Sequence, residues 1–193
     1  MQKTKIRNIN QGRTIVFVKY KTQNNGGQMN RIMFVCHGNI CRSPMAEFIM
    51  KCLVNTLGIS DRYCIASSAT SPEELYSPMY PPAQRELSRH GIPYERREAT
   101  LLSKEDYNRF DIFALMDERN LRNISRIFTS DTEGKICKLM SFTGNPRDVS
   151  DPWYSGDFAT AYNDILEGCV SLLISLEPTL TRAEILHALS ERA

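Results

Sequence analysis

The 193-residue sequence lacks the features that mark metal-dependent, membrane-spanning or secreted proteins. It has only three histidines, and no Cys-x-x-Cys pair or His/Cys cluster shows zinc spacing, so we expect no metal and no other cofactor. Its apolar runs are too short to span a membrane, and its beginning has no secretory pattern. The six cysteines are not spaced like a disulfide scaffold, so a reducing cytoplasm is the expected compartment.

The sequence also lacks an excess of charge of either sign. It has 24 basic and 22 acidic residues, for a formal net charge of +2, so neither a nucleic acid nor a membrane surface is the expected partner. An apolar content of 41% and a charged content of 24% are typical of globular proteins. The length favours a single domain with one hydrophobic core.

The most informative segment is the eight-residue stretch from Cys36 to Ser43, Cys-His-Gly-Asn-Ile-Cys-Arg-Ser. The apolar run Ile32–Val35 before it predicts a buried strand, and apolar residues at helical spacing follow from Pro44. Ser43 is the predicted N-cap of that helix. The segment therefore joins the carboxyl end of a strand to the amino end of a helix, where free N–H groups and the helix dipole favour a bound anion.

Two side chains of this loop suit attack on a phosphate. A thiol at a helix N-terminus beside a guanidinium favours the thiolate, which makes Cys36 a candidate nucleophile. Arg42 can donate two N–H groups to two phosphoryl oxygens, and Gly38 lets the backbone approach the anion. The spacing Cys-x5-Arg alone is weak, and the bland alternative is an inert buried Cys36 with Arg42 on the surface. The predicted phosphate-binding residues are His37, Gly38, Asn39, Ile40, Cys41 and Arg42.

A late segment, Asp151-Pro152-Trp153-Tyr154, supplies an acid that could protonate a leaving oxygen. Pro152 restricts Asp151 to extended geometry, and the two aromatic side chains could line a pocket for a flat ring. Alone, such a segment is more often a turn followed by packed aromatics. The prediction that this segment belongs to a catalytic site therefore depends on the presence of Cys36 and Arg42.

These segments together resemble the low-molecular-weight protein tyrosine phosphatase family, from about Arg31 to about Leu176. The resemblance implies a phosphatase I-like α/β fold, a single-domain sandwich with a four-stranded parallel sheet flanked by helices. It also implies a metal-free, two-step hydrolysis of phosphotyrosine in proteins, and of small aryl phosphates, through a phosphocysteine. Supporting segments are Ser67–Ser71, His90–Pro93, Phe110–Glu118 and Asn120–Leu121.

Residue roles follow from the resemblance. Cys36 would be the nucleophile, Arg42 would bind the phosphoryl group, and Asp151 would be the general acid and then the base. Trp153 and Tyr154 would line the substrate mouth. The loop would be supported by Asn39, Ser43 and Ser67, although the Ser67 hydroxyl could instead cap a turn.

Some positions depart from the family's pattern. His37 stands where several members have an apolar residue or threonine, and its side chain is expected to point outward. Arg96 stands where eukaryotic members often have a histidine bonded to the loop support, so this part of the support stays open.

Three other functions are alternatives to phosphotyrosine hydrolysis. Relatives that act on phosphoarginine carry a threonine where this chain has Ile40, which has no hydroxyl. Thioredoxin-coupled arsenate reductases need a further cysteine pair in the middle segment, and none lies between Cys64 and Cys137. A silent phospho-residue reader would not need a nucleophile, a phosphate-binding arginine and an acid together.

Cys41 is the predicted redox partner of Cys36, as the adjacent cysteine is in this family, so a thiol-based redox switch is a further alternative. Cys41 could instead be a small apolar residue packed beneath the loop, and both can hold. The other cysteines are expected in the core: Cys52, Cys64, Cys137 and Cys169.

Alternating strand and helix patterns predict βαβ units and a site at the strands' carboxyl ends. Residues 29–178 are the expected phosphatase domain. Residues 1–28 are expected to be a poorly ordered extension rather than an added edge strand, and 179–193 a helical tail with a capped helix at 181–192. The predicted strands are 31–36, 63–67, 112–116 and 138–142, and the predicted helices are 44–57, 81–90, 104–109, 118–128 and 157–176.

Overall fold

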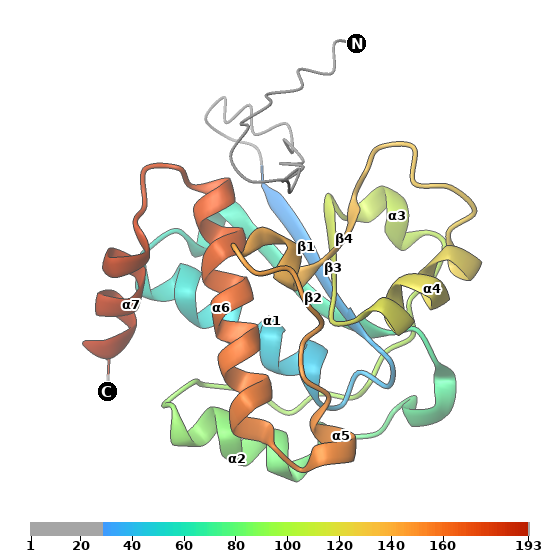
Figure 1. The fold of residues 1–193 in the computed structure, drawn as a ribbon, viewed down its shortest axis with the longest axis horizontal. Helices are drawn as coiled ribbons and strands as arrows, with labels where there is room; N and C mark the ends of the chain where they lie inside the picture. The colour runs from blue at the N-terminus through green and yellow to red at the C-terminus, as the bar shows by residue number, and fades with distance from the viewer. Residues whose placement is uncertain (1–28, 193) are drawn as a thin grey trace.

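The computed structural model describes residues 29–192, and its centre is a four-stranded parallel sheet with the order β2-β1-β3-β4. Cys36 at the end of β1 lies opposite Ala69 of β2. The predicted α/β fold with a parallel sheet is confirmed, and β1 is one of its two inner strands (Figure 1). The strands are β1 (Asn30–Cys36), β2 (Tyr63–Ala69), β3 (Ile112–Leu115) and β4 (Ile136–Lys138).

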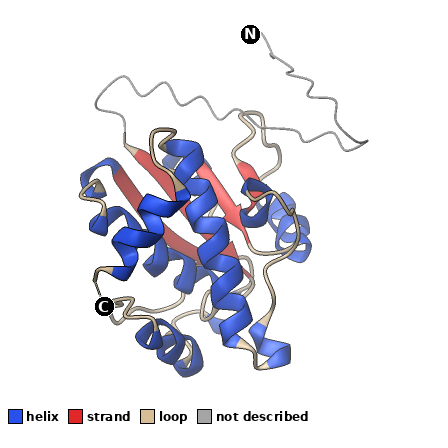
Figure 2. Cartoon of the chain, turned by 60° about the vertical axis from the view of Figure 1, so that its left-hand side comes forward, coloured by secondary structure: helices blue, strands red, loops and turns tan. Residues whose placement is uncertain are grey.

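Helices cover both faces of the sheet (Figures 1 and 2). Because side chains alternate along a strand, Ile32 and Phe34 of β1 join one apolar cluster, and Met33 and Val35 join another. The first cluster includes residues of α1 (Arg42–Thr56), α2 (Pro81–Arg89), α6 (Phe158–Leu176) and α7 (Arg182–Ser190). The second includes Ile124 of α4 (Glu118–Ile127) and Phe110, which follows α3 (Asp106–Arg109).

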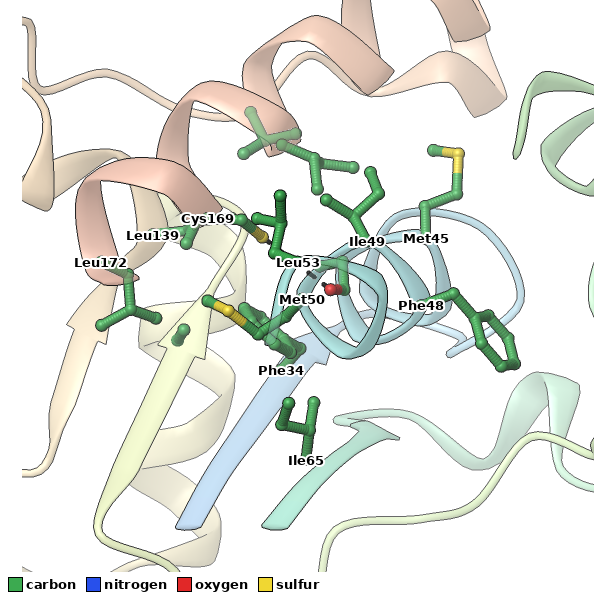
Figure 3. Packing of buried hydrophobic residues seen from close by; sticks show 14 of the residues in the cluster. Phe34, Met45, Phe48, Ile49, Met50, Leu53, Ile65, Leu139, Cys169 and Leu172 are labelled. Carbon is green, nitrogen blue, oxygen red and sulfur yellow. Dashed lines mark hydrogen bonds between the residues drawn. The ribbon is translucent and has the colours of Figure 1, made fainter. Parts of the chain in front are cut away.

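In the core, α1 packs on both β1 and α6. Figure 3 shows Phe34 of β1 beside Met50 and Leu53 of α1, with Cys169 of α6 next to Leu53 and Leu172 of α6 in the same cluster. All five side chains are at most 2% exposed. This packing fixes the N-terminus of α1 at the carboxyl edge of the sheet, where the loop from Cys36 to Ser43 lies.

The last strand was predicted wrongly. The expected strand at 138–142 is a 3-10 helix, η3 (Leu139–Phe142), and β4 ends at Lys138. Leu139 and Met140 are both buried, as consecutive residues of a strand covered on both faces also are, so the apolar run alone did not separate the two structures. Gly168 of α6 permits this packing, since a Cβ there would lie 2.5 Å from Cγ of Leu139.

Other expectations need smaller corrections. Ser43 is not the N-cap: α1 begins at Arg42 after Cys41, which frees the Ser43 hydroxyl for the loop. Cys64 is exposed rather than in the core, because it lies at the start of the edge strand β2 while α4 packs on β3 and β4. Cys137 is half-buried, and Cys52 and Cys169 are buried as expected.

The C-terminal helix α7 packs on α1 and α6 and buries Ile185. It begins with a capping box between Thr181 and Glu184, as the sequence predicted. Within residues 29–192, no helix has the length and apolar character needed to cross a membrane. The expectations for 1–28 lie outside the described residues.

Candidate active site

The loop from Cys36 to Ser43 lies at the carboxyl end of β1 and turns into α1. Its tight turn depends on Asn39, whose φ of 56° is in the left-handed region that asparagine tolerates better than most residues. The turn directs the Asn39 N–H at the Cys36 Sγ, 3.3 Å away. A side chain at position 38 would crowd Glu74, because a Cβ there would lie 3.0 Å from its Cγ.

The Cys36 thiol is enclosed by this loop and is 3% exposed. Its Sγ lies 3.0 Å from the Ser43 Oγ, besides its contact with the Asn39 N–H. Hydrogen bonds of this kind stabilise the negative charge of a thiolate. The arrangement therefore suits a nucleophilic sulfur at the base of an anion-sized loop.

Arg42 is buried and is held by two carboxylates. Its Nη1 donates to the Asp117 Oδ2 at 2.7 Å, and its Nη2 donates to the Asp151 Oδ2 at 2.9 Å. Burial alone would lower the pKa of Arg42, but negative charge at Cys36, Asp151 and Asp117 outweighs it and raises that pKa above its ordinary value. The guanidinium is thus a fixed positive charge beside the thiol.

Asp151 reaches the site from the other end of the chain, 109 positions after Arg42. It is the N-cap of the short helix α5 (Pro152–Ser155), where its Oδ1 accepts from the Trp153 N–H at 3.2 Å. The structure therefore brings together the three side chains that the sequence singled out. At the mouth, Trp153 is 54% and Tyr154 77% exposed, and the Trp153 ring lies 5.4 Å from that of Tyr80.

A hydrogen-bond network behind the loop holds Asn39 in place. Its Nδ2 donates to the Ser43 Oγ at 2.8 Å and to the Ser67 Oγ at 2.9 Å, so Ser67 does lie against Asn39. Ser67 in turn donates to the Glu47 Oε2 at 2.6 Å. The left-handed turn is therefore fixed by residues of α1 and β2.

Arg97 is a supporting residue that the sequence analysis missed. Its two terminal nitrogens donate to the backbone carbonyl and the Oδ1 of Asn39 at 3.0 and 2.7 Å, whereas Arg96, the position considered from the sequence, is exposed. Burial lowers the pKa of Arg97, despite the opposing charges of Glu47 and Cys36. Only the neighbouring position, Arg96, pointed to this part of the support.

Asp117 was also missed as a contact of Arg42, although a signal existed. It follows the strand β3 and caps α4, with its Oδ1 accepting from the Asn120 N–H at 2.6 Å. A carboxylate at the carboxyl end of a strand next to β1 is placed to face the loop. It could have been predicted from that position.

The remaining loop residues have mixed environments. Cys41 is 7% exposed, and burial, with the charge of Cys36, raises the pKa of its thiol to about 12. His37 turns away from the thiol and pairs through Nε2 with the Glu73 Oε2 at 2.9 Å. Ile40 is buried, with its carbonyl accepting from the Tyr80 N–H. Among the described residues, no group of three His, Cys, Asp or Glu side chains could hold a metal ion.

A parallel α/β domain with a thiol and a guanidinium at the carboxyl edge of its sheet defines the class of Cys-x5-Arg phosphatases. Residues 31–182 match the model of the low molecular weight phosphotyrosine protein phosphatase family, and the chain belongs to this family. It is therefore a protein-tyrosine phosphatase, as the sequence predicted.

Individual relatives agree with this assignment. The low molecular weight phosphotyrosine protein phosphatase of Homo sapiens is 37% identical over 150 residues, which cover 74% of this chain and 92% of the relative. PtpA of Staphylococcus aureus strain MRSA252, a low molecular weight protein-tyrosine-phosphatase, is 35% identical over 143 residues, 74% of this chain and 90% of the relative.

Two solved structures share the fold. YfkJ from Bacillus subtilis superposes with a TM-score of 0.76 at 30% identity and covers 81% of this chain and 99% of that one. The low molecular weight protein tyrosine phosphatase SP-PTP from Streptococcus pyogenes gives a TM-score of 0.69 at 33% identity, with 83% and 99% covered.

Proposed function

We propose that the protein hydrolyses phosphotyrosine in proteins, and small aryl phosphates, through a phosphocysteine formed on Cys36. The observation that carries the proposal is the position of the Cys36 thiol in the turn of a loop whose Arg42 bonds Asp151 at 2.9 Å. These side chains are the nucleophile, the phosphoryl-binding group and the acid that such a reaction needs.

In the first step the thiolate of Cys36 attacks phosphorus, and the bond from phosphorus to the tyrosine oxygen breaks. Asp151 donates its proton to that oxygen, and neutral tyrosine leaves. Arg42 binds two oxygens of the phosphoryl group while negative charge is redistributed over that group in the transition state. The hydrogen bond between Arg42 and Asp151 must therefore open when the substrate binds. Asp117 keeps Nη1 of Arg42 in place meanwhile.

In the second step a water molecule attacks the phosphocysteine, and Asp151, now a carboxylate, accepts a proton from that water. The S–P bond breaks, the Cys36 thiolate is restored, and inorganic phosphate leaves. The ring of the substrate would lie between Trp153 and Tyr154 at the mouth, both of which are exposed.

A comparison of two substrates tests this function. The protein should hydrolyse a phosphotyrosine peptide at least about 100-fold faster, in kcat/KM, than the same peptide with phosphoarginine, because Ile40 offers no hydroxyl for the chemistry at nitrogen. Release of inorganic phosphate measures both. Equal or greater activity on phosphoarginine would contradict the proposal and support the arginine phosphatase.

We also propose that Cys41 protects Cys36 from irreversible oxidation. Peroxide would convert the Cys36 thiolate to a sulfenic acid, and the Cys41 thiol would condense with it, forming a disulfide and releasing water. Both cysteines are free and buried in the structure, and the charge of Cys36 acts on Cys41. The raised pKa of Cys41 keeps it a neutral thiol beside the nucleophile.

Replacing Cys41 with serine is therefore expected to make peroxide inactivation irreversible. The native enzyme should regain most of its activity after dithiothreitol, and Cys41→Ser should regain less than about a tenth. Cys64→Ser, a change at an exposed cysteine, is the matched control and should behave like the native enzyme. Equal recovery by Cys41→Ser would count against the redox role.

We propose residues 29–178 as the catalytic domain, followed by a helical tail at 179–193, and the cytoplasm as the compartment. The family match over 31–182 supports the domain, and the need for a reduced Cys36 supports the compartment.

A further inference from the structure

A basic cleft of about 560 Å³ lies beside the catalytic loop. One wall includes His37 of the loop together with Thr70 and Ser71, which follow β2. The other wall is α4, which contributes Arg119, Arg122 and Arg126. We call this site the arginine cleft. No aspartate or glutamate is among its lining residues.

The three arginines form one basic face of α4. Positions i, i+3 and i+7 lie on the same side of a helix, and all three side chains are exposed. None of them makes an ion pair with a carboxylate in residues 29–192. Like charges at this spacing repel and destabilise a helix slightly, so an anion bound among them would stabilise this face.

Glu73, a carboxylate on which the charge of Arg119 acts, already has a hydrogen-bond partner. Glu73 has a lowered pKa, caused first by its hydrogen bond to His37 and only lastly by Arg119. Its Oε2 lies 2.9 Å from the His37 Nε2. Glu73 therefore leaves the guanidinium groups of the cleft available to a ligand.

The arginine cleft is continuous with the loop that would hold the phosphoryl group. The Thr70 N–H donates to the Cys36 carbonyl at 2.9 Å, and the Ser71 N–H donates to the His37 carbonyl at 3.0 Å. On the other wall, Asp117 at the start of α4 bonds Arg42. Figure 1 shows α4 following β3, the strand next to β1, and α4 packs on β3 and β4. A peptide with its phosphotyrosine in the loop would thus have neighbouring residues within reach of the cleft.

We propose that the arginine cleft binds acidic side chains near the phosphotyrosine of a protein substrate, which makes acidic phosphotyrosine segments the preferred substrate class. The inference rests on the proposed function. Arginine forks match carboxylates in geometry as well as charge. A nucleic acid or an anionic membrane would need a wider basic surface, and the chain as a whole has a net charge of only +2.

The test uses a triple variant, Arg119→Gln with Arg122→Gln and Arg126→Gln, because glutamine keeps helix propensity and the three side chains are exposed. Its kcat/KM on a phosphotyrosine peptide with acidic flanks should fall about tenfold. Activity on the same peptide with neutral flanks, and on p-nitrophenyl phosphate, should stay within about twofold. High salt should reduce the native preference for the acidic peptide.

Arg182→Gln is the matched control, since Arg182 is an exposed arginine on α7, across the molecule from α4 (Figure 1). It should leave all three activities unchanged. An equal loss on p-nitrophenyl phosphate in the triple variant would overturn the inference, because the arginines would then act through the catalytic loop. Equal native kcat/KM values for the acidic and neutral peptides would also overturn it.

A binding measurement separates this inference from the proposed function. Fluorescence anisotropy should show that Cys36→Ser binds the acidic phosphotyrosine peptide about tenfold more tightly than Cys36→Ser carrying the three glutamines. Equally tight binding of a single-stranded RNA would overturn the inference in favour of a general polyanion surface. If the native enzyme fails to hydrolyse p-nitrophenyl phosphate, the proposed function is wrong. The binding measurement still shows whether the arginine cleft binds acidic peptide segments.

Discussion

Replacing Cys36 with serine is expected to lower phosphotyrosine hydrolysis by at least about 10⁴-fold while leaving phosphate binding intact. A serine hydroxyl is a far weaker nucleophile towards phosphorus than a cysteine sulfur, so the phosphoenzyme does not form. The rest of the loop does not depend on the sulfur. Asn39 is held by Ser43, Ser67 and Arg97, and an oxygen at position 36 can still accept from the Asn39 N–H.

Phosphate release from a phosphotyrosine peptide measures the loss, and calorimetry with inorganic phosphate measures the remaining binding. Cys64→Ser, at the exposed end of β2, is the control and should keep full activity. Residual activity within tenfold of native would rule out Cys36 as the nucleophile. Loss of phosphate binding together with activity would mean instead that the substitution had collapsed the loop.

The fold was predictable wherever local pattern and tertiary packing agree. The first three strands and the long helix α6 were expected within a few residues, because each apolar run must be buried by a neighbouring layer. The segment 138–142 was mispredicted because an apolar run fits either a strand or a buried turn. Here the close packing of α6 at Gly168 on Leu139 favours the 3-10 helix, and a contact so distant in sequence cannot be read from the local pattern.

The candidate site was predictable in its reacting groups but not in its supports. The thiol and the guanidinium share one loop, and parallel-sheet topology predicts that the loop before α5 reaches the same edge. Arg97 and Glu47 could not be inferred in this way, since charged side chains are exposed by default. Their places are fixed by the hydrogen-bonding needs of the buried Asn39 and Ser67, which only the folded arrangement reveals.

Replacing Asp151 with asparagine is expected to lower kcat on phosphotyrosine peptides by about 10²–10⁴-fold. The amide cannot donate a proton to the tyrosine oxygen as an acid does, so the leaving group must depart as an anion. The local structure should survive, because asparagine is as good an N-cap as aspartate and can accept from the Trp153 N–H.

Comparing substrates with different leaving groups tests whether Asp151 is the proton donor. The loss should be largest for phenyl phosphate and phosphotyrosine and should shrink towards about tenfold for p-nitrophenyl phosphate, whose phenolate leaves without a proton. Asp148→Asn, at a partly exposed carboxylate of the same loop that bonds Lys138, should show no such dependence. A uniform loss across the series would mean that Asp151 acts by positioning Arg42, to which it is bonded at 2.9 Å, and the proton donor would have to be sought elsewhere.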